Sequence, residues 1–178
     1  MFRLREGDDD GDDEEEEGGE EGENAEGKGW NGRMLGVDYS QKSIEFAQRI
    51  AADKVDGRRD VEFLHWDIMT SPPTPILSPP NTTGWDVVLD KGTFDAISLS
   101  EEVDEQGRRI CEGYKDKVVP LMRKGGILLV TSCNWTEEEL EGWFVGGELE
   151  RVGGIGYKSF SFGGRKGQTV CSVCFRRR

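Results

Sequence analysis

The sequence has few residues that could support metal binding or histidine- or cysteine-based catalysis. It contains one histidine, His65, and four cysteines in 178 residues. Cys171 and Cys174 have C-x-x-C spacing, but a zinc site needs a second pair or additional histidines, and residues three apart on a strand point to opposite faces. We therefore expect no metal site, and a Ser-His-Asp or Cys-His mechanism would depend on His65 alone. Four cysteines are also too few for a disulfide scaffold, so a cytoplasmic location is expected.

Long apolar runs and clusters of basic residues are also absent. No stretch of about 18 apolar residues occurs, so the sequence predicts no membrane span. The N-terminus lacks the apolar region of a signal peptide. The three arginines at 176–178 are too few to form a nucleic-acid-binding surface. We therefore expect neither a membrane nor a nucleic acid as a partner.

The excess of negative charge is confined to one segment. The formal net charge is −13, but 13 of the 36 acidic residues lie within residues 8–26, which contain no lysine or arginine. The other 23 acidic residues balance the 23 lysines and arginines. Because this segment has no apolar periodicity, we expect residues 1–32 to form a disordered acidic segment and residues 33–178 to form one folded domain. Such a segment acts as a solvating tail or as a weak attractant for basic partners.

Apolar runs alternate with helical patterns through the rest of the chain. We predict strands at 33–37, 61–66, 85–89 and 127–130, and helices at 44–51, from 94, at 114–124 and from 136 onward. Gly125 and Gly126 are predicted to end the helix at 114–124, and Thr136 and Glu139 form a capping-box pattern at the start of the last helix. Residues 157–162 and 169–175 are predicted to form an antiparallel hairpin. This order indicates an α/β fold with a doubly wound, Rossmann-like sheet and a C-terminal antiparallel hairpin.

The strand at 85–89 is followed by polar residues suited to ligand binding. Its run of β-branched residues predicts a strand buried on both faces, central in a parallel sheet. Asp90 and Thr93 then lie at the carboxyl end of that strand, where open α/β sheets bind ligands. Either Thr93 or Asp95 can cap the helix that follows. The alternative is that Asp90 and Thr93 only end the strand and begin the helix.

Two earlier strands also end on aspartate. Asp38 follows the first strand, and an acidic residue at that position accepts hydrogen bonds from ribose hydroxyls in nucleotide-binding α/β domains. Asp67 follows the second strand and could accept a hydrogen bond from an adenine amino group, with Ile68 against the ring. The alternative for each aspartate is a turn-forming role.

The three aspartates and three longer motifs resemble a known family. Asp38, Asp67 and Asp90 match the later signature positions of seven-stranded, S-adenosylmethionine-dependent methyltransferases. More narrowly, the segments LDKGTFDAISL (89–99), TSCNWTEEEL (131–140) and FSFGGRKG (160–167) are similar to lysine methyltransferases that modify translation elongation factor 1-alpha. The segment GVDYS (36–40) agrees with this resemblance, which covers about residues 33–175.

The resemblance implies a cofactor, a substrate and a set of site residues. It implies S-adenosyl-L-methionine as cofactor and elongation factor 1-alpha as protein substrate, with the chain acting as a monomer. It implies that cofactor-binding residues are Asp38, Tyr39, Asp67, Ile68 and Asp90, and that Asp90 is also the candidate catalytic residue. It further implies that the substrate is contacted by Phe94, Asn134, Trp135 and Phe162.

One expected feature of the family is absent from the sequence. These enzymes have a glycine-rich loop after their first strand, which lets the backbone approach the methionine half of the cofactor. Residues 1–5 are similar to the end of the helix that follows this loop, so we expect a truncated methyltransferase domain that lacks the first strand. The strand ending at Asp38 and the strand ending at Leu89 are then expected either to pair directly or to leave a gap.

Three functional hypotheses follow. The first is a protein-lysine N-methyltransferase, which the later motifs support. The second is an inactive, truncated methyltransferase fold that acts as a protein-binding module, which the absence of the glycine-rich loop supports. The third is a methyltransferase with a small-molecule or different protein substrate, because a fold does not determine its substrate.

Overall fold

The computed structural model describes residues 32–53, 61–157, 160–162, 165–167 and 170–178. Contacts divide the chain into two units, residues 1–33 and residues 34–178, and the second unit contains the helices and strands described below. The prediction of a disordered acidic segment at residues 1–32 falls, except for residue 32, outside the described residues.

Helices and strands alternate through most of the second unit, as the sequence pattern predicts. Their order along the chain is β1 (Met34–Asp38), α1 (Gln41–Asp53), β2 (Val61–His65), β3 (Trp85–Lys91), α2 (Thr93–Ser98), η1 (Ile110–Gly113), α3 (Tyr114–Val118), η2 (Val119–Leu121), β4 (Met122–Ser132), α4 (Glu137–Phe144), β5 (Leu149–Ile155), β6 (Phe160–Phe162), β7 (Arg165–Gly167) and β8 (Cys171–Arg177).

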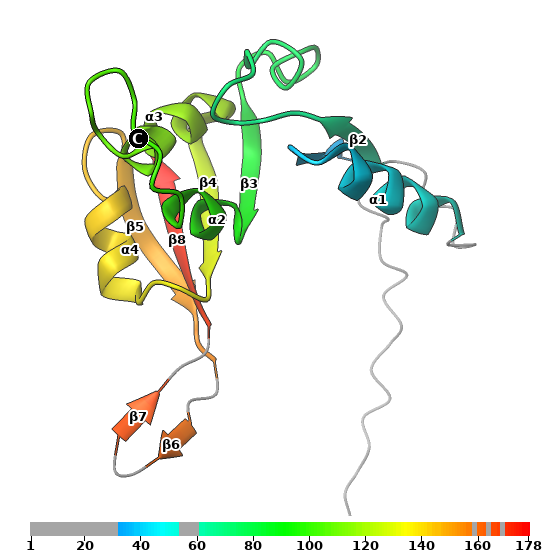
Figure 1. Cartoon of the computed structure of the whole chain (residues 1–178). Coiled ribbons are helices and arrows are strands. Elements are labelled where there is room, and N and C mark those ends of the chain that lie inside the picture. Colours follow the sequence, from blue (N-terminus) through cyan, green and yellow to red (C-terminus); the bar gives the residue numbers. More distant parts are fainter. Residues whose placement is uncertain (1–31, 54–60, 158–159, 163–164, 168–169) are drawn as a thin grey trace, which may run out of the picture. The chain divides into compact units, whose positions relative to one another are not determined.

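The described strands form three separate sheets. β1 and β2 are parallel, with Met34 opposite Val61 and Asp38 opposite His65. A four-stranded sheet has the order β3-β4-β8-β5, in which β3 and β4 are parallel and β8 is antiparallel to both of its neighbours (Figure 1). The short strands β6 and β7 pair only with each other. The fold is therefore mixed α/β, but one continuous doubly wound sheet is not observed.

The prediction that β3 is buried on both faces is wrong. β3 has one hydrogen-bonded neighbour, β4, and the side chains of Val87 and Leu89 are 52% and 72% exposed. The physical reason is that Val88 faces the core clusters on the helix-covered side of the sheet, whereas Val87 and Leu89 alternate with it and point to the opposite face. Among the described strands β3 pairs only with β4, so it also lies at the edge of its sheet. Of the two expected arrangements, the structure has the gap and not direct pairing of β1 with β3.

The C-terminal antiparallel pair exists, but its first strand differs from the prediction. β8 pairs with β5 at residues 149–155, and the predicted first strand at 157–162 contributes only the short β6. The sequence signal for β5 was weak because Gly153 and Gly154 interrupt its alternation of apolar residues. Gly154 is close-packed, since a Cβ there would lie 2.7 Å from the backbone oxygen of Ser172 on β8.

The prediction that Gly125 and Gly126 end a helix is also wrong. The helical segment ends earlier, at η2, and β4 begins at Met122. The two glycines instead lie in an irregular part of β4. Gly125 has φ +77°, and a Cβ on Gly126 would lie 2.9 Å from the backbone oxygen of Trp85 on β3. Glycine is required here by a positive φ and by a close approach between strands.

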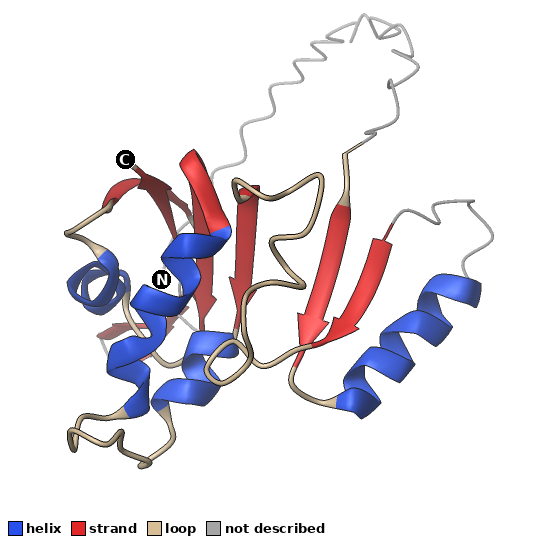
Figure 2. Ribbon diagram, turned by 90° about the horizontal axis from the view of Figure 1, so that it is seen from above, coloured by secondary structure: helices blue, strands red, loops and turns tan. Residues whose placement is uncertain are grey.

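One face of the four-stranded sheet is covered by helices. The alternating residues Leu128, Val130, Val173 and Phe175 have at most 1% of their surface exposed. They form one core cluster with apolar residues of α2, α3 and α4, and Figure 2 shows these helices on a single face of the sheet. Burial of such large apolar side chains is the main stabilising contribution to this part of the fold.

A second, smaller core cluster fixes the proline-rich loop. Trp66, Ile76 and Leu121 are its buried members. The indole N–H of Trp66 donates to the backbone oxygen of Pro72 at 2.9 Å, and the indole N–H of Trp85 donates to that of Ile76 at 3.1 Å. Residues 70–84, which contain five of the six prolines, thus form a loop without regular structure that is held by two indole groups.

Candidate functional site

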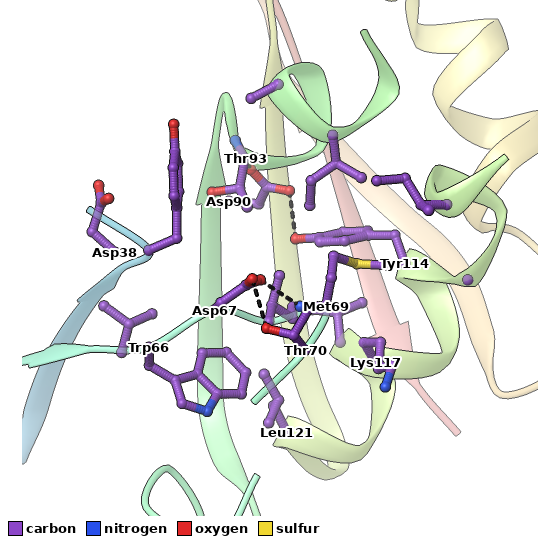
Figure 3. Close-up of a pocket in the computed structure, with 18 of the residues that line it drawn as sticks. Asp38, Trp66, Asp67, Met69, Thr70, Asp90, Thr93, Tyr114, Lys117 and Leu121 are labelled. Carbon is purple, nitrogen blue, oxygen red and sulfur yellow. Dashed lines mark hydrogen bonds between the residues drawn. The ribbon is translucent and has the colours of Figure 1, made fainter. Parts of the chain in front are cut away.

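The three strand-end aspartates line one cavity. Asp38, Asp67 and Asp90 follow or end β1, β2 and β3, and they share a cavity of about 730 Å³ (Figure 3). The parallel strands end at the same side, so their terminal side chains converge as the sequence predicts. Tyr39 and Ile68, the other two predicted cofactor-binding residues, also line this cavity.

Asp38 is oriented by its own turn. One of its carboxylate oxygens accepts a hydrogen bond from the backbone N–H of Ser40 at 2.7 Å. The adjacent Tyr39 is 72% exposed, and its backbone oxygen is 2.8 Å from Nε2 of His65. This contact gives the single histidine a structural partner, and His65 does not line the cavity.

Asp67 is oriented by the residues that follow it. One carboxylate oxygen accepts from the backbone N–H of Met69 and the other from the hydroxyl of Thr70, each at 2.8 Å (Figure 3). Ile68 packs against both core clusters. The carboxylate therefore keeps a fixed direction while retaining lone pairs for a ligand.

Asp90 is the most buried of the three aspartates, with 3% of its surface exposed. Its carboxylate accepts hydrogen bonds from the backbone N–H groups of Thr93 at 2.8 Å and Phe94 at 3.1 Å, and from the hydroxyl of Tyr114 at 2.7 Å. Burial raises the pKa of this carboxyl above its usual value, and the negative charge of Asp95 adds to the increase. The three hydrogen bonds act in the opposite direction.

Asp90 also supplies the cap that the sequence analysis assigned to Thr93 or Asp95. Helix α2 begins after Gly92, which has φ +81° and makes no side-chain cap. The first N–H groups of the helix point to the Asp90 carboxylate instead. The prediction of a Thr93 or Asp95 cap is wrong, because the left-handed turn at Gly92 aims the helix start back at the strand end.

Asp95 holds the loop that follows β4. Its carboxylate accepts from the hydroxyl of Ser132 at 2.5 Å and from the backbone N–H of Cys133 at 2.8 Å. The Ser132 hydroxyl in turn accepts from the backbone N–H groups of Asn134 at 3.0 Å and Trp135 at 2.9 Å. The network fixes the backbone that carries the two predicted substrate-binding residues, although neither side chain lines the cavity.

Phe94, the first of the predicted substrate-binding residues, is buried in the core. It is 1% exposed and lies within an aromatic cluster, with ring centroids 5.0 Å from Phe144, 5.4 Å from Tyr114 and 5.5 Å from Trp143. These contacts favour a packing role for Phe94, and its contact with a substrate stays a prediction. The sequence could not separate the two, because an aromatic residue in the first turn of a helix faces either a ligand or the core.

The remaining predicted substrate residues differ in position. Trp135 is partly buried against the core, and its indole N–H donates to the hydroxyl of Ser98 at 3.0 Å. Asn134 is exposed. Phe162 ends β6, and its side chain lies outside the described residues.

Several cavity residues were not singled out from the sequence. They are Met69, Thr70, Tyr114, Lys117 and Leu121. Tyr114 and Leu121 lie in the helix predicted at 114–124, and a helical pattern carries no information on whether a tyrosine hydroxyl faces a cavity. For Thr70 a usable signal existed, since a hydroxyl three residues after a strand-end aspartate can hydrogen-bond to it.

The cavity combines hydrogen-bond acceptors with apolar walls. The three carboxylates can accept from hydroxyl, amino and ammonium groups, and Ile68, Val88, Val118 and Leu121 provide apolar surface. Within the described residues, no group of three or more histidine, cysteine, aspartate or glutamate side chains could hold a metal ion. The site is thus suited to binding and orienting a ligand that has hydroxyl and amino groups and an apolar ring.

Known proteins with similar sequences are methyltransferases. Residues 19–152 match the family described as "Methyltransferase domain". The chain is 37% identical over 147 residues to protein-lysine N-methyltransferase EFM4 of Saccharomyces cerevisiae, which covers 82% of this chain and 60% of that protein. It is 32% identical over 144 residues to EEF1A lysine methyltransferase 2 of Homo sapiens, covering 81% of this chain and 56% of that protein. The chain thus spans about 60% or less of the length of these curated relatives.

Solved structures support the fold. The magnesium protoporphyrin IX methyltransferase of Synechocystis, solved with bound SAM, has a TM-score of 0.54 at 12% identity and covers 82% of this chain and 60% of its own. The cyclase SpnF has a TM-score of 0.53 at 12% identity and covers 82% of this chain and 66% of its own. In the part of the chain that the structure describes, no helix is both long and apolar enough to cross a membrane. Fold, cavity and family match together show that the chain belongs to the methyltransferase domain family.

Proposed function

We propose that the chain is the catalytic part of an S-adenosylmethionine-dependent protein-lysine N-methyltransferase that acts on translation elongation factor 1-alpha. One observation carries this proposal: the three strand-end aspartates of a chain 32–37% identical to proteins named for that activity converge on one cavity. We further propose that it acts as a monomer in the cytosol, where its four free cysteines would stay reduced.

The residues of the cavity fit S-adenosylmethionine. We assign Asp38 to the ribose hydroxyls, with Tyr39 beside it, and Asp67 to the adenine amino group, with Ile68 as apolar contact. These assignments match each carboxylate with a donor that it can accept from. Asp90 is assigned to the ammonium group of the methionine part, because a buried carboxylate is best compensated by a cation.

When bound, S-adenosylmethionine supplies a methyl group on a positively charged sulfur, which is a good leaving group. The protein then has two tasks, which are to align the lysine amine and to keep it neutral. A free lysine has a pKa of about 10.4, and apolar surroundings lower it. The apolar walls near Asp90 favour the neutral amine. Asp90 itself opposes deprotonation of a nearby ammonium, so its role is to bind and orient, not to act as a base.

Asn134 is the proposed contact for the substrate lysine. Its side chain is exposed, and its backbone N–H is fixed by the Ser132 hydroxyl. Trp135 is proposed to support this position from the core side, and the contact of Phe162 with substrate stays a prediction. A fixed loop that presents one free amide group provides a positioned hydrogen-bond partner for an amine.

The proposal is tested by measuring cofactor binding and methyl transfer with the 178-residue chain. S-adenosylmethionine is titrated calorimetrically into the wild type, and methylation of elongation factor 1-alpha is followed by mass spectrometry. Asp38→Asn is expected to weaken binding about ten- to a hundredfold, as expected for loss of a hydrogen bond to a charged group. Asp116→Asn is the matched control, since Asp116 is an exposed aspartate of α3 that does not line the cavity.

The outcomes separate the three hypotheses. Binding with methylation of the elongation factor supports the proposal. Binding with methylation of a different protein or a small molecule supports the third hypothesis and rejects elongation factor 1-alpha as the substrate. No binding at any accessible concentration supports the non-catalytic module, a hypothesis that is favoured by the lack of a described strand joining β1 to β3.

A further inference from the structure

The Asp90 carboxylate has one side-chain hydrogen-bond donor among the described residues, the hydroxyl of Tyr114. The donor and acceptor oxygens are 2.7 Å apart, and both residues line the cavity (Figure 3). Tyr114 is 2% exposed and Asp90 is 3% exposed. The two residues are 24 positions apart in sequence, so the contact is created by the packing of α3 against the end of β3.

The ring of Tyr114 is fixed by the aromatic cluster. Its centroid lies 5.4 Å from that of Phe94 and 6.1 Å from that of Phe144, the latter at an interplanar angle of 89°. Rings packed at such distances restrict each other's side-chain torsions. The hydroxyl therefore has a fixed location at the boundary between the core and the cavity, and it points at Asp90 (Figure 3).

The proton of this contact belongs to the tyrosine. Burial and the adjacent Asp90 charge raise the pKa of Tyr114 well above its usual value of 10.0. Because its pKa is raised above the usual value, Tyr114 keeps its proton and stays a hydrogen-bond donor at neutral and acidic pH. Asp90, the acceptor, experiences opposing influences on its own pKa. Burial and the Asp95 charge raise it, whereas the hydrogen bond from Tyr114 is the largest contribution that lowers it.

We propose that Tyr114 is a positioning residue for Asp90, holding its carboxylate ionised and oriented toward the cofactor's ammonium group. The inference rests on the proposed function for the identity of the ligand, while the contact itself is independent of it. The groups that face Asp90 are the Tyr114 hydroxyl from α3, the N–H groups of Thr93 and Phe94 from α2, and the Asp95 carboxylate from α2. The Tyr114 hydroxyl is the hydrogen-bond donor among them that a substitution can delete by removing one heavy atom, as in Tyr114→Phe.

The test compares Tyr114→Phe with Tyr157→Phe. Tyr157 also has a hydroxyl partner, the side chain of Ser172 at 2.8 Å, but it does not line the cavity. S-adenosylmethionine binding is measured calorimetrically between about pH 5 and pH 8. Without the Tyr114 hydroxyl, Asp90 takes up a proton at higher pH, so the loss of affinity on the acidic side is expected to move upward. Affinity in that range is expected to fall about tenfold.

The control variant is expected to follow the wild-type pH profile. A purely structural role for Tyr114 would weaken binding equally at all pH values, or not at all, and would leave the position of the acidic limb unchanged. An unshifted limb in Tyr114→Phe therefore overturns the inference.

A second measurement does not depend on a stable Tyr114→Phe protein. The sequence has three tyrosines, so a Tyr39→Phe, Tyr157→Phe double variant can be labelled with 3-fluorotyrosine at Tyr114 alone. The fluorine makes the phenol a stronger donor, and the acidic limb is expected to move downward relative to the unlabelled double variant. No shift, or an upward shift, contradicts the proposal.

Failure of the proposed function can be distinguished from failure of the inference. If the wild type binds S-adenosylmethionine and Tyr114→Phe shows the same pH profile, the inference alone is wrong. If the wild type does not bind, the proposed function is wrong. The effect of Tyr114 on Asp90 can then be measured without a ligand, by following the ¹³C NMR signal of the Asp90 carboxyl group against pH. A higher titration midpoint in Tyr114→Phe than in the wild type supports the inference, and equal midpoints refute it.

Discussion

Replacing Phe94 with alanine tests whether this side chain belongs to the core or to a substrate site. Phe94 is 1% exposed, and its ring packs against Tyr114, Trp143 and Phe144. Truncation of a fully buried phenylalanine costs about 3–5 kcal/mol, through lost burial and the cavity left behind. Loss of the aromatic pairs places the expected value in the upper part of that range.

The assay is urea unfolding followed by far-ultraviolet circular dichroism, with the free energy of unfolding obtained by linear extrapolation. Phe46→Ala is the matched control, because Phe46 lies on α1 with 60% of its surface exposed. The control is expected to change the free energy of unfolding by less than about 0.5 kcal/mol. A loss of less than about 1 kcal/mol in Phe94→Ala, together with reduced methyl transfer, would refute the core assignment and restore a substrate role.

Three further changes test other parts of the structure. The two carboxylate oxygens of Asp95 accept from two donors, the Ser132 hydroxyl and the Cys133 N–H, and Asp95→Asn retains only one acceptor oxygen, so thermal unfolding should show a loss of about 1–3 kcal/mol. Gly84→Ala places a Cβ 2.3 Å from the backbone of Met122 at φ +106°, and should cost more than about 2 kcal/mol, whereas Gly142→Ala, with open space inside α4, should stabilise by about 0.5–1 kcal/mol. Because burial raises the pKa of Asp90, the native state retains its proton to higher pH than the unfolded chain. Its contribution to the free energy of unfolding therefore falls as pH rises from the usual aspartate value of 3.8 through the raised one, and this component should be missing from Asp90→Asn in a pH series of unfolding curves.

The ends of the strands could be predicted from sequence because they depend on local pattern. Apolar runs followed by aspartate identify both a strand and its polar end, and Asp38, Asp67 and Asp90 all line the cavity as a result. The capping box at Thr136 was confirmed for the same reason, since Thr136 and Glu139 are three residues apart and bond to each other's backbone.

Features that depend on distant residues could not be predicted. Asp95 looked like a helix cap, but its partner Ser132 is 37 positions away, and only the packed structure brings the two together. The hydrogen bond of the Tyr114 hydroxyl could not be predicted either, because its partner, Asp90, is 24 positions earlier in the sequence. The exposed edge of β3 was missed for a related reason, since a run such as Val87 to Leu89 has the same composition in a central strand and in an edge strand.

The loop held by Trp66 and Trp85 gives the protein an optical signal of its own. Trp66 lines the cavity and is bonded to the proline-rich loop, so its indole connects the two. Indole emission depends on the polarity of its surroundings, and Trp66 is only 6% exposed. A ligand that enters the cavity and a loop that detaches from it would therefore change the emission in different ways, the first by quenching and the second by a shift to longer wavelength. Binding and loop opening can thus be followed in the unlabelled chain, provided that the other four tryptophans are controlled for.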